Sequence, residues 1–352
     1  MNKQIYKSTG KKSLFDEQFL VEKLTEIGNP LEMINKVIDF EMFRGNLEIK
    51  LLNSNKKNNA GAKPFDVVLM FKILILQRYY GLGDKQVEYQ ILDRTSFKNF
   101  LKLETGDKVP DEKTVWAFRE NLTKLGIIED IFAAFKEFLE VKELIFNEGQ
   151  MIDASFTIAP RQRNTREENE KIKNGEGDDL WNDNKHKKCH KDIDARWTKK
   201  NNENFYGYKN HAKVDTKSKF VNTFVVTSAS VHDSQATDDL LDENDEGQEL
   251  YADSAYTGEN QEETIAKHKM INKVHEKGYR NNPLTDEQKK NNTEKSRTRA
   301  RVEHVFGFME QSMKGLKLKS IGIIRATGII GLINLTYNLF RYEQVIRLNI
   351  LA

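Results

Sequence analysis

The chain has 352 residues, 38% of them hydrophobic and 31% charged, which is enough for two domains or one large domain with appendages. Its 56 Lys and Arg nearly balance its 54 Asp and Glu, but the sign of the charge varies by segment, so a nucleic-acid partner is not excluded. The single cysteine, Cys189, excludes an intramolecular disulfide and is typical of a reducing compartment.

Nothing in the sequence indicates secretion or a membrane span. The first six residues are polar and lead into no apolar signal core. The longest uncharged stretch, 326–340, is shorter than the roughly 20 residues of a membrane span and contains two asparagines. We therefore expect a soluble cytoplasmic protein.

Residues 1–145 are predicted to form an all-α N-terminal domain. An apolar segment follows Pro64 and runs to Tyr80 with the spacing of a buried helix. A glycine-rich turn at 81–84 separates it from a helix at 85–92, and another helix begins after Pro110. Short helices joined by tight turns resemble helix-turn-helix proteins, in which one helix enters a DNA groove. A packing or dimerisation domain gives the same pattern, so DNA binding and dimerisation both stay open.

From residue 146 to 348 the pattern changes to strands followed by alternating helices and strands. Short apolar runs predict strands at 149–154, 204–214, 219–228, 249–254 and 270–275. Helical spacing predicts helices at 258–269, 293–314 and 321–348. This order predicts an α/β domain, more specifically an α+β mixed sheet covered by helices.

A charged insertion of about fifty residues, 155–205, separates the first two predicted strands. It starts with a basic block that contains Arg161 and Arg163, continues with an acidic block, and ends with a second basic block at 185–200. Long polar insertions in compact domains are usually functional or disordered. We expect the basic blocks to contact the phosphate backbone of DNA, with a solvated charged hairpin as the alternative.

Two runs of the sequence could be taken for metal sites, but neither has the full ligand pattern. The run from His186 to His190 lacks the further cysteines of a structural zinc site. The acidic run 242–247 resembles a calcium loop, but its twelfth position would be Asp253, inside a predicted strand. We interpret that run as an exposed helix end and loop. The sequence contains no glycine-rich phosphate loop.

Three separate carboxylates are the strongest candidates for chemistry: Asp153, Asp253 and Glu303. Both aspartates end predicted strands, and the glutamate lies on an arginine-rich helix. Mg²⁺ and Mn²⁺ prefer oxygen ligands, and two such ions can activate an attacking oxygen and stabilise a leaving oxygen in phosphodiester chemistry. Taken alone, each acid has a structural explanation as a turn cap or an ion-pair partner, so spacing alone does not establish the site.

The sequence around these acids resembles the insertion-sequence transposases of the DDE class, in particular the IS5 family. The resemblance covers most of the chain from about residue 60 and rests on Val109–Asp111, Trp116–Arg119, Met151–Ser155, Tyr206–His211, Ala229–Ser234, Tyr251–Tyr256 and Arg299–Phe306. It implies a ribonuclease-H-like catalytic core with an insertion between its first two strands. It also implies that Asp153, Asp253 and Glu303 are the catalytic and metal-binding residues.

The resemblance further implies what the protein acts on. Two Mg²⁺ or Mn²⁺ ions per site would support hydrolysis at transposon ends, followed by attack of the freed 3′ hydroxyl on target DNA. The partners would be transposon and target DNA and at least one further copy of the chain, in a bacterial cytoplasm near the nucleoid. A catalytically silent DNA-binding derivative and a metal-dependent nuclease without strand transfer are the alternatives.

Basic residues near the acids are candidate DNA contacts. From Lys277 to Arg301 there are eight basic and three acidic residues, and Arg299 and Arg301 precede the triad glutamate. Lys209 and His211 alternate along one predicted strand and would face the same side. In many relatives a basic residue follows the triad glutamate by seven positions, whereas this chain has Glu310 there. This departure affects a DNA contact, not the triad.

Overall fold

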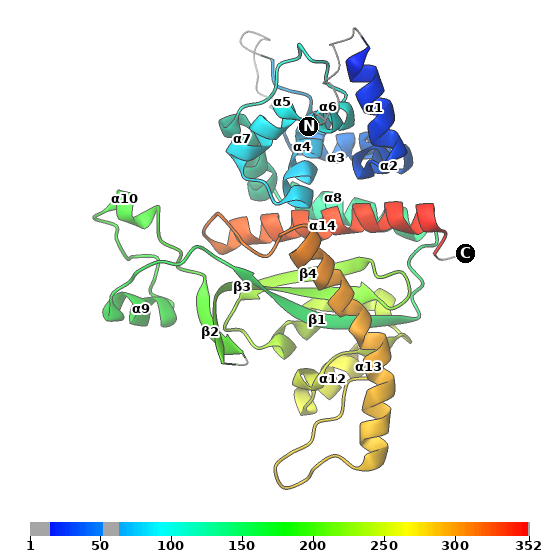
Figure 1. The fold of residues 1–352 in the computed structure, drawn as a ribbon. Coiled ribbons are helices and arrows are strands. Elements are labelled where there is room, and N and C mark those ends of the chain that lie inside the picture. The colour runs from blue at the N-terminus through cyan, green and yellow to red at the C-terminus, as the bar shows by residue number, and fades with distance from the viewer. Residues whose placement is uncertain (1–14, 52–62, 201, 351–352) are drawn as a thin grey trace, which may run out of the picture.

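One long helix, α14 (Ile323–Leu348), lies between a layer of N-terminal helices and a β-sheet (Figure 1). The computed structural model describes residues 15–51, 63–200 and 202–350, so the polar segment 1–6 lies outside the described residues. Helix α14 is long and apolar enough to cross a membrane, but 78% of its apolar window is buried inside the protein. The N-terminal helices cover one side of α14 and the sheet covers the other, so apolar residues occur around the whole helix. It is a core helix.

Two asparagines fix the position of α14 on the sheet. Asn334 and Asn210 exchange amide hydrogen bonds of 2.9 and 3.1 Å. Asn338 accepts from the backbone N–H of Val221 and donates to its carbonyl oxygen, at 2.9 and 2.8 Å. Buried amides that satisfy each other in this way stabilise one register, because any shift of the helix would leave polar groups without partners.

The N-terminal layer is helical, as predicted. Its elements are α1 (Asp16–Glu26), α2 (Pro30–Val37), η1 (Phe40–Phe43), α3 (Arg44–Leu51), α4 (Val67–Tyr80), α5 (Asp84–Asp93), α6 (Thr95–Leu101), α7 (Glu112–Lys124) and α8 (Ile127–Val141). The helices predicted at 65–80, at 85–92 and after Pro110 are confirmed as α4, α5 and α7. Helix α4 is buried on nearly every side and, with α14, forms part of one hydrophobic core that continues onto the sheet.

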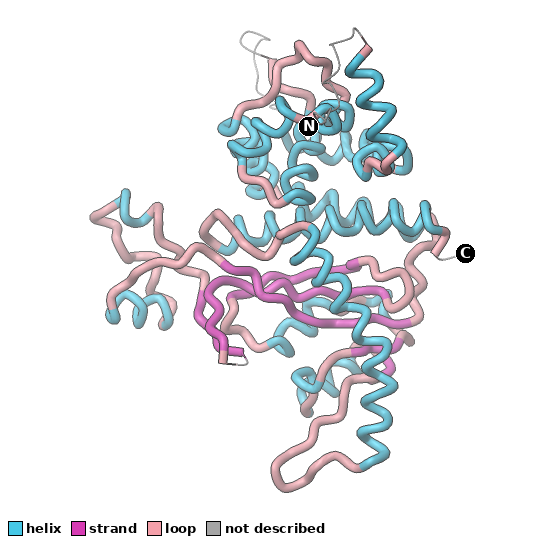
Figure 2. Tube along the Cα trace, in the orientation of Figure 1, coloured by secondary structure: helices cyan, strands magenta, loops and turns pink. Residues whose placement is uncertain are grey.

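The sheet is mixed, as predicted, and contains all five predicted strands. Its strands are β1 (Gly149–Ile158), β2 (Arg196–Lys200), β3 (Glu203–Asp215), β4 (Val221–Ser228), β5 (Glu249–Tyr251) and β6 (Ile271–Asn272). Both β2 and β4 pair with β3 on the edge opposite β1, and the remaining order is β3, β1, β5, β6. Strands β1 to β4 pair antiparallel, whereas β1, β5 and β6 run parallel. The strands, magenta in Figure 2, gather below α14.

The charged insertion is shorter than predicted. Strand β1 continues to Ile158, and β2 forms a hairpin with β3, so the irregular part spans 159–195. This part holds α9 (Arg166–Lys173) and α10 (Lys185–Lys188), which project from the end of the sheet (Figure 1). Asp192 and Asp194 accept the first backbone N–H groups before and within α14, at 3.0 and 2.9 Å. Two acids inside the second basic block thus cap α14, and they anchor the insertion to the core.

Helix α13 (Asp286–Gly307) crosses the sheet and carries the predicted Glu303. It starts seven residues earlier than predicted, at a capping box between Thr285 and Gln288, and continues as a π-helix, η5 (Phe308–Ser312). Val302, Val305 and Phe306 are buried in the core, whereas Arg299 and Glu303 lie on another face of the helix.

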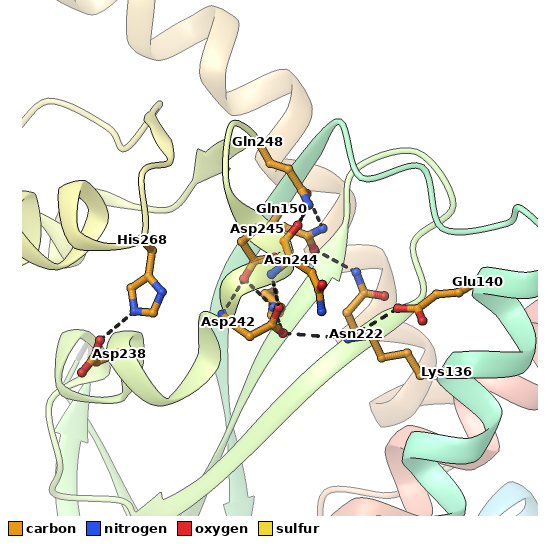
Figure 3. Close-up of polar contacts among 11 residues, drawn as sticks. Lys136, Glu140, Gln150, Asn222, Asp238, Asp242, Asn244, Asp245, Gln248 and His268 are labelled. Atoms are coloured by element: carbon orange, nitrogen blue, oxygen red, sulfur yellow. Dashed lines mark hydrogen bonds and ion pairs between the residues drawn. The ribbon is translucent and has the colours of Figure 1, made fainter.

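The acidic run 242–247 forms a short 3₁₀-helix, η3 (Glu243–Asp245), and a turn, and four of its six residues are exposed, as expected; Asp245 is buried. Lys213, 1% exposed, pairs with Asp242 and Asp245 at 2.9 and 2.6 Å. Gln150 links Gln248 to Asn222 through hydrogen bonds of 2.8 and 3.0 Å, and these side chains form one polar network beside α8 (Figure 3). Lys213 on β3, distant in the sequence, thus neutralises Asp242 and Asp245, and these two carboxylates have a structural role rather than that of calcium ligands.

Candidate active site

Asp153 and Asp253 lie at matching positions on neighbouring strands. Strands β1 and β5 are parallel, with Met151 opposite Tyr251, and each aspartate follows two residues later. Neighbouring strands lie about 4.8 Å apart, and side chains two residues apart point to the same face. The parallel pairing therefore brings the two carboxylates together, although a hundred positions separate them in the sequence.

Local backbone contacts orient both carboxylates. Oδ1 of Asp253 accepts a 2.7 Å hydrogen bond from the Ala255 N–H and caps the short helix η4 (Ser254–Tyr256). The sequence predicted a strand over 249–254, which would include Asp253. Strand β5 ends at Tyr251, so Asp253 lies just beyond it. Oδ1 of Asp153 accepts a 2.8 Å hydrogen bond from the N–H of Ala154.

The environment of Asp153 disfavours its negative charge. Burial raises the pKa of this carboxyl to about 6; the Ala154 N–H and Arg299 oppose the shift, and the charge of Asp253 adds to it. A raised carboxyl pKa beside an ion-paired arginine means that the available positive charge does not compensate for burial. A site with this imbalance gains free energy when a further cation enters.

Arg299 connects Asp153 to Glu303. Its Nη1 lies 3.2 Å from Oδ2 of Asp153, and its Nη2 lies 2.9 Å from Oε1 of Glu303, one helical turn further along α13. Arg299 and Asp153 are 20% and 17% exposed, whereas Glu303 is 59% exposed. The third acid thus reaches the site through the arginine and keeps an open side toward solvent.

The face of α13 that carries Arg299 is fixed by contacts one and two turns earlier. Asn292 exchanges two 2.9 Å hydrogen bonds with the backbone of Glu276. Lys295 donates to the carbonyl oxygen of Val274 at 2.9 Å, and Ser296 lies 3.3 Å from Nε2 of His275. These contacts hold α13 against the segment that follows β6 and so set the position of Arg299.

Two further side chains border the carboxylates, and the sequence did not single them out. Tyr256 is 2% exposed, and its hydroxyl is buried without a hydrogen-bond partner. Burial and the nearby charges of Asp153, Asp233 and Asp253 raise the pKa of Tyr256 well above its ordinary value. The pKa of His275 is lowered by burial and then by Arg299. Tyr256 belongs to the stretch Tyr251–Tyr256, so its proximity to Asp253 in the sequence was the available signal.

The donor set fits a hard divalent cation. Asp153, Asp253 and Glu303 offer carboxylate oxygens, which Mg²⁺ and Mn²⁺ prefer. Within residues 15–51, 63–200 and 202–350, no three acidic, histidine or cysteine side chains already converge as a metal cluster. Arg299 instead lies between Asp153 and Glu303, and its positive charge offsets the repulsion between these two carboxylates.

Comparison with known proteins identifies the family. Residues 152–339, just over half of the chain, match the family model described as "Transposase DDE domain". The chain belongs to the DDE transposases. Residues 19–121 of this DDE transposase match a second model, "Transposase domain (DUF772)". No solved structure matches the chain. The first match spans all three acids, and the second covers most of the N-terminal helices.

Lys209 and His211 of the transposase do not lie where a DNA contact requires them. His211 has no exposed surface, and its Nε2 lies 2.8 Å from the Thr227 hydroxyl. Lys209, 7% exposed, donates to the Val231 carbonyl oxygen at 2.6 Å and pairs with Asp233 at 2.7 Å. Both face the same side of β3, as predicted, but that side is covered. In this arrangement Lys209 supports the segment after β4, His211 contacts β4 itself, and neither is open to DNA.

The predicted basic contacts on the insertion and on α13 differ in exposure and partners. Arg161 and Arg163 are exposed, and the guanidinium of Arg161 lies 5.6 Å from the ring centre of Trp197. Arg301 is exposed but donates a 2.8 Å hydrogen bond to the carbonyl oxygen of Thr216. Glu310 is exposed on the π-helix η5, outside the contacts that unite Asp153, Arg299 and Glu303.

Proposed function

We propose that this DDE transposase moves a bacterial insertion sequence by cutting its DNA ends and joining the freed 3′ hydroxyl groups to target DNA. One observation carries the proposal: two carboxylates, Asp153 and Asp253, lie at matching positions on parallel strands, and Arg299 links a third, Glu303, to Asp153. The sequence resemblance supports assignment to the IS5 family in particular.

Asp153, Asp253 and Glu303 would hold two divalent cations, with Mg²⁺ as the first candidate and Mn²⁺ as the alternative. When bound, such ions lower the pKa of an attacking water or hydroxyl and stabilise the leaving oxygen of a phosphodiester. The raised pKa of Asp153 supports this assignment, because a cation offsets the unfavourable burial of its charge. Asp153 and Asp253 are fixed by local backbone N–H groups, so their oxygens are oriented in advance.

The residues around the acids bind and orient the substrate in this proposal. Arg299 holds Glu303 in place and adds positive charge where a phosphate would approach. The basic stretch 277–301 leads into the site and would attract the DNA backbone. Arg161 and Arg163 would extend this contact from the insertion, whereas Lys209 would support the segment that carries Asp233 and His211 would pack against Thr227 of β4.

The rest of the assignment follows the same resemblance. The mixed sheet, with β5 and β6 parallel to β1, supports a ribonuclease-H-like core over residues 146–348. The helices of residues 1–145 would bind DNA or a second copy of the chain. At least a homodimer is proposed, because two ends must be joined in concert, and the bacterial cytoplasm near the nucleoid is the proposed location.

Joining separates this proposal from a nuclease without strand transfer. Purified protein is incubated with Mg²⁺ or Mn²⁺, a duplex that carries the element's end and a circular target plasmid. The proposal predicts cleaved ends together with end–target joint molecules. Cleavage that never yields joint molecules, even when the end is supplied already cut, would assign a nuclease. End binding without cleavage would assign a silent DNA-binding derivative.

A further inference from the structure

A small cavity of about 70 Å³ lies where the turn between α4 and α5 meets the segment that joins η5 to α14. It does not include any of the three acids. Five basic side chains line it: Arg78, Arg119, Lys314, Lys317 and Lys319. The lining therefore combines residues from the helical layer with residues that follow the catalytic helix α13.

The turn is built for close approach of these two segments. Gly81 has φ +63, which favours glycine, and a Cβ there would lie 3.0 Å from Cβ of Lys314. A Cβ on Gly83 would lie 3.0 Å from Nζ of Lys319. The two glycines thus allow the lysine segment to approach the turn, and the amine of Lys319 occupies the space that a side chain at position 83 would need.

The positive charge in this cavity is mostly uncompensated. Asp84 is the one carboxylate in the lining, and Arg119 binds both of its oxygens, at 2.6 and 2.9 Å. Nε of Arg78 is buried without a partner. Lys317 and Lys319 are exposed, and neither forms an ion pair within the described part of the chain. Burial lowers the pKa of Arg78 to about 10, so it remains charged at neutral pH.

We propose that this cavity binds one phosphate group of the DNA backbone, an inference that rests on the proposed function. A volume of about 70 Å³ is several times the roughly 10–15 Å³ that one water molecule needs, which leaves room for a single tetrahedral oxyanion. Arginine and lysine are the residues that hold phosphate oxygens. A polyanion also neutralises several of these cations at once.

The place of the cavity links it to the catalytic strand. Backbone bonds of 2.8 Å join Ile158, the last residue of β1, to Leu316 and Leu318 on either side of Lys317. Asp153 lies five residues earlier on β1, at roughly 3.3 Å per residue, or about 16 Å away along the strand. Phosphates follow one another at about 3.4 Å of helix axis per DNA strand, so for DNA whose axis follows β1 the contact would fall roughly five nucleotides from the cut.

The test compares two double variants with equal charge loss. Lys317→Ala/Lys319→Ala removes two cavity lysines that are exposed, so the fold is kept. Lys267→Ala/Lys269→Ala is the matched control, because these exposed lysines are already paired with Asp238 and Glu246. Binding of a short DNA duplex is measured by fluorescence anisotropy, without divalent metal, from 50 to 200 mM salt.

We expect the cavity variant to bind more weakly on every duplex and to lose about one unit of the log–log salt slope. Over that fourfold salt range the wild type then loses about fourfold more affinity than the cavity variant does. The control keeps the wild-type slope. Equal slopes for wild type and cavity variant, in a protein that still joins DNA ends, overturn the cavity assignment alone.

Inorganic phosphate distinguishes a backbone phosphate from a free anion. If phosphate raises the melting temperature of the wild type but not of the cavity variant, while their DNA salt slopes agree, the cavity binds a free anion and the DNA assignment is wrong. A wild-type protein that binds no DNA overturns the proposed function and, with it, this inference.

Discussion

Replacing Asp153 with asparagine is expected to stabilise the metal-free protein while removing its activity. The folded-state pKa of about 6 lies above the ordinary value of 3.8, so the folded protein binds more protons than the unfolded chain between these values. The destabilisation caused by this carboxylate is therefore absent below about pH 4 and reaches its full size above about pH 6. Asparagine keeps the shape and the hydrogen-bonding oxygen but carries no charge.

The magnitude follows from the shift. About two pKa units at 1.36 kcal/mol each correspond to roughly 3 kcal/mol at pH 8, and to about half of that at pH 5. At about 2.1 cal/mol/K per residue, the unfolding entropy of 352 residues is about 0.7 kcal/mol/K, so the melting temperature should rise by about 4 °C at pH 8. The carboxylate at position 153 thus lowers the stability of the metal-free protein but is required for its activity.

Thermal unfolding of wild type and Asp153→Asn, both with a chelator, at pH 8 and pH 5 measures the effect. Asp238→Asn is the control: its carboxylate is exposed, and Lys267 and His268 lower its pKa, so its removal should be slightly destabilising. An Asp153→Asn protein that melts below the wild type at pH 8, or whose advantage does not shrink at pH 5, would refute the reasoning about buried charge.

Three further substitutions test the scaffold. Lys213→Met should cost roughly 3–5 kcal/mol in urea unfolding, because it leaves Asp245 buried without its cation, and adding Asp245→Asn should recover part of the loss; strict additivity of the two changes would argue against the pair. His211 has a pKa lowered to about 4 by burial, so wild-type stability should fall by up to about 3 kcal/mol from pH 6.5 toward 4, and His211→Gln should flatten that profile; an unchanged profile contradicts this. Gly207→Ala should destabilise strongly, since its Cβ would lie 2.2 Å from the Thr157 carbonyl oxygen, and circular dichroism showing a wild-type melting curve would refute it.

The catalytic acids were predictable because short-range patterns are enough to place them. An aspartate in an apolar run places each carboxylate on or next to a predicted strand, and parallel pairing of those strands brings the two together. The prediction that Asp153 ends its strand is wrong, because β1 continues to Ile158. The contact from Arg299 to Glu303 is an i,i+4 pair, visible from helical spacing alone. Which strands become neighbours was not visible, and the family resemblance supplied it.

Depth and long-range partners escaped prediction. Alternation along β3 shows that Lys209 and His211 share a face, but it does not show that the loop with Asp233 covers that face. The role of Asp192 and Asp194 as caps of α14 likewise depends on a helix more than a hundred residues later. The basic cavity requires a turn at 81–83 to meet lysines at 314–319, and no local pattern encodes that meeting.

Single-turnover cleavage of the element's end DNA, with Mn²⁺ or Mg²⁺, tests the central claim most directly. Asp153→Asn, Asp253→Asn and Glu303→Gln should each bind the DNA yet cut it roughly 10³-fold more slowly or worse, since each removes a ligand for cations that contribute several kcal/mol to the transition state. Asp238→Asn, which changes an exposed carboxylate paired with Lys267 and His268, should cut at the wild-type rate. Metal-dependent cleavage that survives any one of the three substitutions at the wild-type rate would contradict the assignment of that acid to the active site.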